Sequence, residues 1–145
     1  MYRTKINELI DWKNRLDRKP LIVQGARQVG KTWLIKEFGR TTFNKMVYIN
    51  FEDATELQNM FLQDFSIRRI ISVLEAFSGI QIVADDTLIV FDEIQSAQKG
   101  ITSLKYFCEN APEYHVIASD SLLGMNLHNK TSFPVGKVNF MYLCR

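Results

Sequence analysis

The chain has 145 residues, of which 46% are hydrophobic and 23% charged, with a formal net charge of +2, values typical of one soluble globular domain. It contains no run of about 18 apolar residues and no apolar N-terminal core, which argues against a membrane-spanning helix and a signal peptide. The cysteines, Cys108 and Cys144, lack metal-like spacing and are expected to be reduced thiols in the cytoplasm.

The first predicted element is an amphipathic helix over residues 4–17, in an N-terminal segment (1–18) expected to pack on the domain. This end of the chain is basic. Residues 1–45 carry eleven Lys or Arg and four Asp or Glu, whereas residues 46–145 carry seven and twelve. The excess indicates either attraction of phosphates or nucleic acid, or a solvated helix face beside a basic loop. We favour the second interpretation, because charge runs are usually solvated faces.

A strand over 21–24, a glycine-rich loop over 25–32 and a helix ending near Gly39 are predicted next. The loop has the pattern G-x-x-x-x-G-K-S/T, in which backbone N–H groups, a lysine and a helix N-terminus surround phosphates. The residues expected to bind a nucleotide are Gly25, Ala26, Arg27, Gln28, Val29, Gly30, Lys31, Thr32 and Trp33. Lys31 is expected at the β- and γ-phosphates, and the hydroxyl of Thr32 at Mg²⁺.

The rest of the chain alternates predicted strands and helices. Strands are expected over residues 46–51, 87–91, 114–119 and 137–143, and helices over 55–63, 66–78 and 101–110. Strands that alternate with helices imply right-handed crossovers and a parallel sheet covered on both faces. The sequence therefore predicts an α/β fold, a three-layer sandwich with a mainly parallel five-stranded sheet, as a single domain over residues 1–145.

The strand predicted over 87–91 runs directly into two acids, Asp92 and Glu93. Burial of a lone charge is costly, so acids at the end of a buried strand indicate a function, the alternative being a solvated strand end. We expect Asp92 to hold Mg²⁺ and Glu93 to deprotonate the attacking water, with Lys31 as the second catalytic residue. The acids and the glycine loop are expected to meet on adjacent strand tips of one sheet.

Two serines, Ser119 and Ser121, lie at the end of the strand predicted over 114–119, with Asp120 between them. Their hydroxyls are candidates for contact with the γ-phosphate or the attacking water. A serine-rich turn without a ligand explains the residues equally well.

The loop Gly25–Thr32 and the motif Asp92-Glu93-Ile94-Gln95 resemble the Walker A and Walker B motifs of AAA-type P-loop ATPases of bacteria and archaea. The resemblance covers nearly the whole chain and implies ATP and Mg²⁺ as cofactors. Such proteins usually have Gly-Ser where this chain has Asp120-Ser121, and a carboxylate pointing inward there would repel the γ-phosphate. They also continue into a helical lid and a nuclease-like C-terminal domain, which implies that this chain is a C-terminally truncated nucleotide-binding core.

Two functions remain open at this point. The first is ATP binding with Mg²⁺-dependent hydrolysis of ATP to ADP and phosphate in the cytoplasm. The alternative is a nucleotide-binding switch or scaffold with negligible turnover that acts through a protein or DNA partner, and either function allows a homo-oligomer. A GTPase is disfavoured, because Asn129-Lys130-Thr131-Ser132 lacks the acid of a guanine-reading motif.

Overall fold

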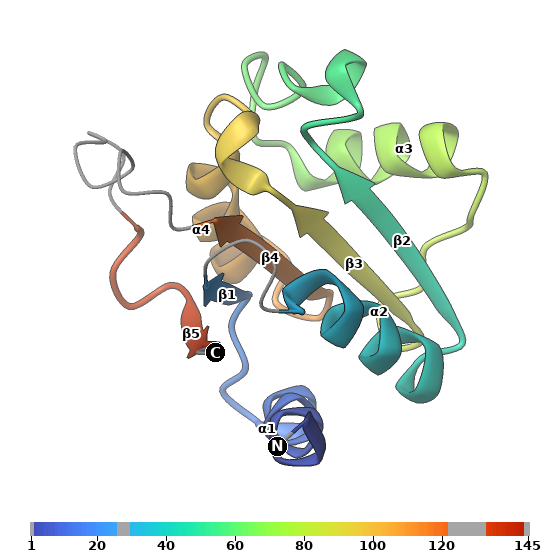
Figure 1. Ribbon diagram of the computed structural model, residues 1–145. Coiled ribbons are helices and arrows are strands. Elements are labelled where there is room, and N and C mark those ends of the chain that lie inside the picture. Colours follow the sequence, from blue (N-terminus) through green and yellow to red (C-terminus); the bar gives the residue numbers. More distant parts are fainter. Residues whose placement is uncertain (1, 26–29, 122–132, 144–145) are drawn as a thin grey trace.

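The computed structural model describes residues 2–25, 30–121 and 133–143, and every element below lies in these ranges. Its centre is a five-stranded sheet in the order β2-β3-β4-β1-β5, and every strand pair is parallel (Figure 1). The strands are β1 (Leu21–Gly25), β2 (Lys45–Asn50), β3 (Thr87–Asp92), β4 (His115–Ser121) and β5 (Asn139–Tyr142). The helices are α1 (Tyr2–Asn14), α2 (Lys31–Thr42), α3 (Ile67–Ser78) and α4 (Gly100–Asn110), with short 3₁₀ turns η1 (Thr55–Leu57) and η2 (Ile94–Ser96).

Helices cover both faces of the sheet, which confirms the three-layer α/β prediction (Figure 1). On one face, Leu9 of α1 and Phe38 of α2 pack against strand residues such as Val90. On the other face, Leu74 of α3 and Phe107 of α4 belong to a second apolar cluster. Burial on both faces explains why the central strands read as near-continuous apolar runs.

The prediction that the glycine loop and the acidic pair lie at the ends of adjacent strands is wrong. The strands β1 and β3 are not adjacent, because β4 lies between them and pairs with both. All residues of β4 are buried, as befits a central strand. Parallel strands still bring their carboxyl ends to one edge of the sheet, so Gly25, Asp92 and Ser121 share that edge.

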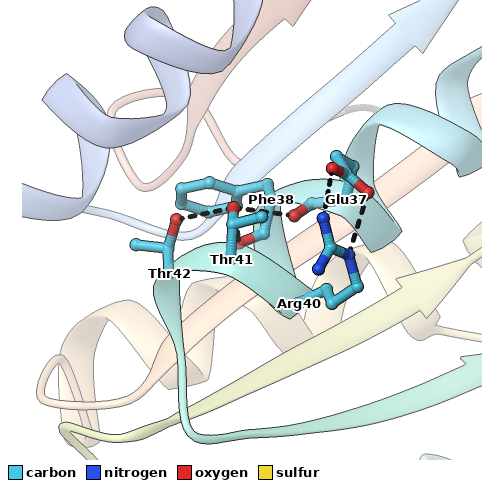
Figure 2. A network of polar contacts seen from close by, with 5 residues as sticks. All are labelled: Glu37, Phe38, Arg40, Thr41 and Thr42. Carbon is cyan, nitrogen blue, oxygen red and sulfur yellow. Dashed lines mark hydrogen bonds and ion pairs between the residues drawn. The ribbon is translucent and has the colours of Figure 1, made fainter.

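The prediction that α2 ends at Gly39 is wrong. The helix continues to Thr42, and its last turn carries an ion pair between Arg40 and Glu37 (Figure 2). Thr41 Oγ1 donates to the Glu37 carbonyl at 2.9 Å. Gly39 lies inside the helix, where an added Cβ would be 2.4 Å from Met46 Sδ. The glycine therefore permits close packing of α2 on the sheet.

The predicted helix over 55–63 is also absent, and only the 3₁₀ turn η1 forms there. Arg69 holds the following loop, with Nη2 2.7 Å from the Met60 carbonyl oxygen and Nε 2.8 Å from Asp64 Oδ1. The next predicted helix is present as α3, which starts after Ser66 and ends at Gly79 in the left-handed region (φ 73°). In the described ranges, no helix has both the length and the apolar character needed to cross a membrane.

Candidate functional site

The residues expected to form the site gather at the carboxyl edge of the sheet, from β1, β3, β4 and the first turn of α2. Four of the expected loop residues, Ala26, Arg27, Gln28 and Val29, lie outside the described residues. Gly30 immediately precedes α2 with φ 85°, a conformation that favours glycine. Trp33 is 55% exposed on the first turn of α2, and its contact with a nucleotide stays a prediction.

Lys31 is a buried cation at the start of α2, 4% exposed. Its Nζ donates to the Gly25 carbonyl at 3.1 Å, the Asp120 carbonyl at 3.4 Å and Ser121 Oγ at 3.4 Å. Among the described residues, no carboxylate forms an ion pair with it. The direct partners of this buried ammonium are neutral oxygens, although its charge also acts on the nearby Asp120 carboxylate, and a cation at the N-terminus of a helix fits a phosphate ligand.

Asp92 ends β3 and is 1% exposed. Its Oδ2 accepts from Thr32 Oγ1 at 2.9 Å and from the Tyr48 hydroxyl, and its Oδ1 accepts from Ser119 Oγ. Three hydroxyl donors therefore replace water around a buried carboxylate. The expected contact between Thr32 of α2 and Asp92 of β3 forms, although β4 separates β1, which precedes the loop, from β3.

Thr32 and Asp92 also supply the oxygen donors that Mg²⁺ prefers. In the described part of the chain, no group of three or more His, Cys, Asp or Glu side chains is arranged to hold a metal. Protein sites for Mg²⁺ commonly use one or two protein oxygens, with waters and substrate phosphates completing the octahedron. The donor set present here fits that kind of site.

Glu93 follows β3 in the left-handed region, with φ 53°, and is 7% exposed. Its Oε1 accepts from Ser121 Oγ at 2.8 Å and from Gln95 Nε2 at 2.8 Å, and its backbone N–H donates to Ser119 Oγ at 3.0 Å. A non-glycine residue with positive φ is strained, and such strain is common at functional sites. The two serines of β4 thus link both acids to Lys31.

Asp120 lies inside β4 rather than after it, and pairs in register with Gln24 of β1. Side chains alternate along a strand, so Asp120 is on the opposite face from Ser119 and Ser121. Burial raises the pKa of Asp120, an effect that the charge of Lys31 opposes. The Asp120 carboxylate nevertheless interacts with the charges of Lys31 and Glu93, so its effect on a γ-phosphate stays a prediction.

Two residues of the site were not expected from the sequence. Tyr48 of β2 donates to Asp92, and Gln95 of η2 donates to Glu93. The signal for Gln95 was its place in the Asp92-Glu93-Ile94-Gln95 motif. No motif marks Tyr48 in the sequence. Its proximity to Asp92 follows from the pairing of β2 with β3, in which Asn50 is opposite Asp92.

Comparison with known proteins identifies the family and the fold of the chain. Residues 17–144 match the family model described as an AAA domain. Among solved structures, the chain is similar to the Orc1 protein of Aeropyrum pernix, solved in complex with DNA, with 13% identity and a TM-score of 0.57. The similarity covers 99% of this chain and 44% of that one, so the chain spans less than half of that protein's length. The chain belongs to the AAA domain family and is a nucleotide-binding core of the P-loop ATPase type.

Proposed function

We propose that the chain binds ATP with Mg²⁺ in the cytoplasm and hydrolyses it to ADP and phosphate. The main support is the 2.9 Å contact between Thr32 Oγ1 and Asp92 Oδ2, which joins residues 60 positions apart. A hydroxyl at the start of α2 beside a buried carboxylate offers two oxygen ligands to one Mg²⁺ ion at the phosphate end of the helix. The buried ammonium of Lys31, which forms no ion pair among the described residues, supports the phosphate half of the same site.

Each side chain has a chemical role in this proposal. Lys31 neutralises charge on the β- and γ-phosphates, and Thr32 with Asp92 holds the metal. Bound Mg²⁺ would stabilise the charge that develops on the phosphate oxygens. Glu93 takes a proton from the attacking water, as a carboxylate at the end of a strand beside the phosphates can do. Ser119 and Ser121 keep the two acids in place.

A second candidate function is a nucleotide-binding switch with negligible turnover that acts through a protein or DNA partner. The observation that favours it is the engagement of Glu93, whose Oε1 already accepts from both Ser121 and Gln95. A base held in this way is less available to water. Release of phosphate distinguishes the two functions, because a switch would retain ATP without turning it over.

The test measures nucleotide affinity and phosphate release by the purified chain. Lys31→Ala should weaken ATP binding by at least about tenfold, because it removes a charge-assisted contact to phosphate. Glu93→Gln should keep the affinity but lower phosphate release by about 100-fold, because an amide cannot accept the proton. Lys137→Ala is the matched control, since that lysine is paired with Glu109 on the surface.

Each outcome tests a separate part of the proposal. Unchanged affinity in Lys31→Ala would refute the phosphate site. Persistent ATP binding by the wild-type chain without phosphate release would support the switch, and binding of duplex DNA that differs with and without ATP would identify its class of partner. Particle size with and without ATP, measured by light scattering, tests for a homo-oligomer.

A further inference from the structure

Tyr48 connects the edge strand β2 to the acid expected to hold the metal. It lies in β2, and its ring is covered by Lys36 of α2, with Nζ 4.2 Å from the ring centroid. Its hydroxyl donates to Asp92 Oδ2, the oxygen that also accepts from Thr32. One side chain therefore crosses from an edge strand to the two residues that the proposed function assigns to Mg²⁺.

Packing alone does not account for a tyrosine here. Tyr48 is half-buried and packs against the apolar cluster between the sheet and helices α1 and α2. Phenylalanine would fill the same volume, and what tyrosine adds is the hydroxyl that reaches Asp92. Burial raises the pKa of Tyr48, and the hydrogen bond to Asp92 raises it further, so the hydroxyl remains a donor at physiological pH.

The other two side chains that donate to Asp92, those of Thr32 and Ser119, also have another partner or an expected ligand. Thr32 is the expected metal ligand, and Ser119 Oγ also accepts the Glu93 N–H at 3.0 Å. Within the described ranges, no cation forms an ion pair with Asp92. A carboxylate that binds a metal needs hydrogen bonds that fix the plane of its two oxygens, and loss of such a bond weakens metal binding.

We propose that Tyr48 is a positioning residue that fixes the Asp92 carboxylate for Mg²⁺ through its hydroxyl. The inference rests on the proposed function, because it assumes that Asp92 serves a metal. It concerns Tyr48 only through Asp92, so Tyr48 need not touch the nucleotide. It predicts a defect that depends on the metal and is absent when the metal is removed.

The experiment measures ATP affinity in excess Mg²⁺ and in EDTA for the wild-type chain and for Tyr48→Phe. In Mg²⁺, Tyr48→Phe should bind ATP about tenfold more weakly than the wild type, and in EDTA the two should be equal. Tyr106→Phe, which removes a hydroxyl from α4 on the opposite face of the sheet, is the matched control and should behave as wild type. Thermal unfolding without nucleotide checks that each variant is folded.

Tyr48→Leu removes the same hydroxyl with a different shape and should show the same metal-dependent loss, so the result does not depend on one variant. A double-mutant cycle adds a second readout. In an Asp92→Asn background, Tyr48→Phe should cause no additional loss, because the carboxylate that it positions is gone.

The outcomes separate this inference from the proposed function. If Mg²⁺ tightens ATP binding equally in wild type and Tyr48→Phe, the inference alone is overturned. An equal loss in Mg²⁺ and EDTA would also overturn it, since that pattern is what a structural role gives. If Mg²⁺ does not affect ATP affinity of the wild-type chain, the metal part of the proposed function fails and the inference fails with it.

Discussion

Asp120 is the most unusual single residue near the site, because its side chain is a carboxylate buried inside a central strand. It is 4% exposed, and within the described part of the chain its Oδ1 has no hydrogen-bond partner. A buried acceptor without a partner costs about 1–3 kcal/mol. Burial raises the pKa of Asp120, so its charged form is disfavoured in the folded state.

Because the pKa of Asp120 is higher in the folded state, deprotonation of this residue lowers the free energy of unfolding. The cost is absent when Asp120 is protonated in both states, below its ordinary pKa of 3.8, and is present in full above the raised folded-state pKa. Asp120→Asn should therefore raise the free energy of unfolding by about 1 kcal/mol at pH 7 and leave it unchanged near pH 3. Urea unfolding measures both values, with exposed Asp53→Asn as the control. A loss of stability at pH 7 would show that the charged carboxylate has a partner.

At the residue scale, the sequence predicted those site residues whose letters form a motif. Lys31, Thr32, Asp92 and Glu93 are recognised by spacing alone, and the structure brings them together. Tyr48 has no motif, because its importance depends on a strand pairing that joins residues more than 40 positions apart. Pairings of this kind are set by tertiary packing, which local patterns do not encode.

At the element scale, the failed prediction at Gly39 has the same origin. Glycine often marks the end of a helix, but here α2 continues and uses the missing side chain to approach β2. A Cβ at this position would lie 2.4 Å from Met46 Sδ and 3.2 Å from Leu88 Cδ2. Local propensity favoured a helix end, and close packing of the helix on the sheet overrode it.

If Gly39 is needed for close packing, the effect of Gly39→Ala on the free energy of unfolding should change sign when Met46 is shortened. Gly39→Ala should lower the free energy of unfolding by about 1 kcal/mol, because the clash with Met46 outweighs the better helix propensity of alanine. In a Met46→Ala background, the same Gly39→Ala change should instead be stabilising, because the space for the methyl group is then available. Urea unfolding of the four proteins gives the cycle. A stabilising effect of Gly39→Ala in the wild-type background would mean that α2 ends or packs differently.

At the scale of the whole molecule, the alternation of strands and helices predicted the layers and the parallel sheet, but not the order of its strands. The connection from β1 through α2 leads to β2 at the far edge, and β3 and β4 then fill the space between them. The carboxyl edge can be predicted from parallel pairing alone, and this is why the expected residues gather there although β1 and β3 are not neighbours. The order of the strands depends on how helices and strands pack in three dimensions. The periodicity of apolar residues does not specify this packing.

One buried side chain links several of these layers. His115 begins β4 and is 6% exposed, with its ring 6.2 Å from that of Trp12 in α1 and 5.3 Å from that of Phe43 after α2. Its Nδ1 is 2.9 Å from the Ala84 carbonyl oxygen. Burial lowers the pKa of His115 from its ordinary value of 6.5, while the Ala84 contact opposes the shift. The neutral ring is therefore part of the apolar junction between helices and sheet.

Stability of the whole domain should accordingly depend on pH. In the unfolded chain this histidine takes up a proton near pH 6.5, whereas in the folded chain it stays neutral to lower pH, so protonation favours unfolding. The free energy of unfolding should fall as the pH drops from 8 through about 6.5 to 5.5, by at most about 1.4 kcal/mol per pH unit. His115→Phe should flatten this dependence in urea titrations, while His128→Phe serves as the comparison. If the slope survives in His115→Phe, or disappears in His128→Phe, another group controls it and the junction does not depend on a neutral His115.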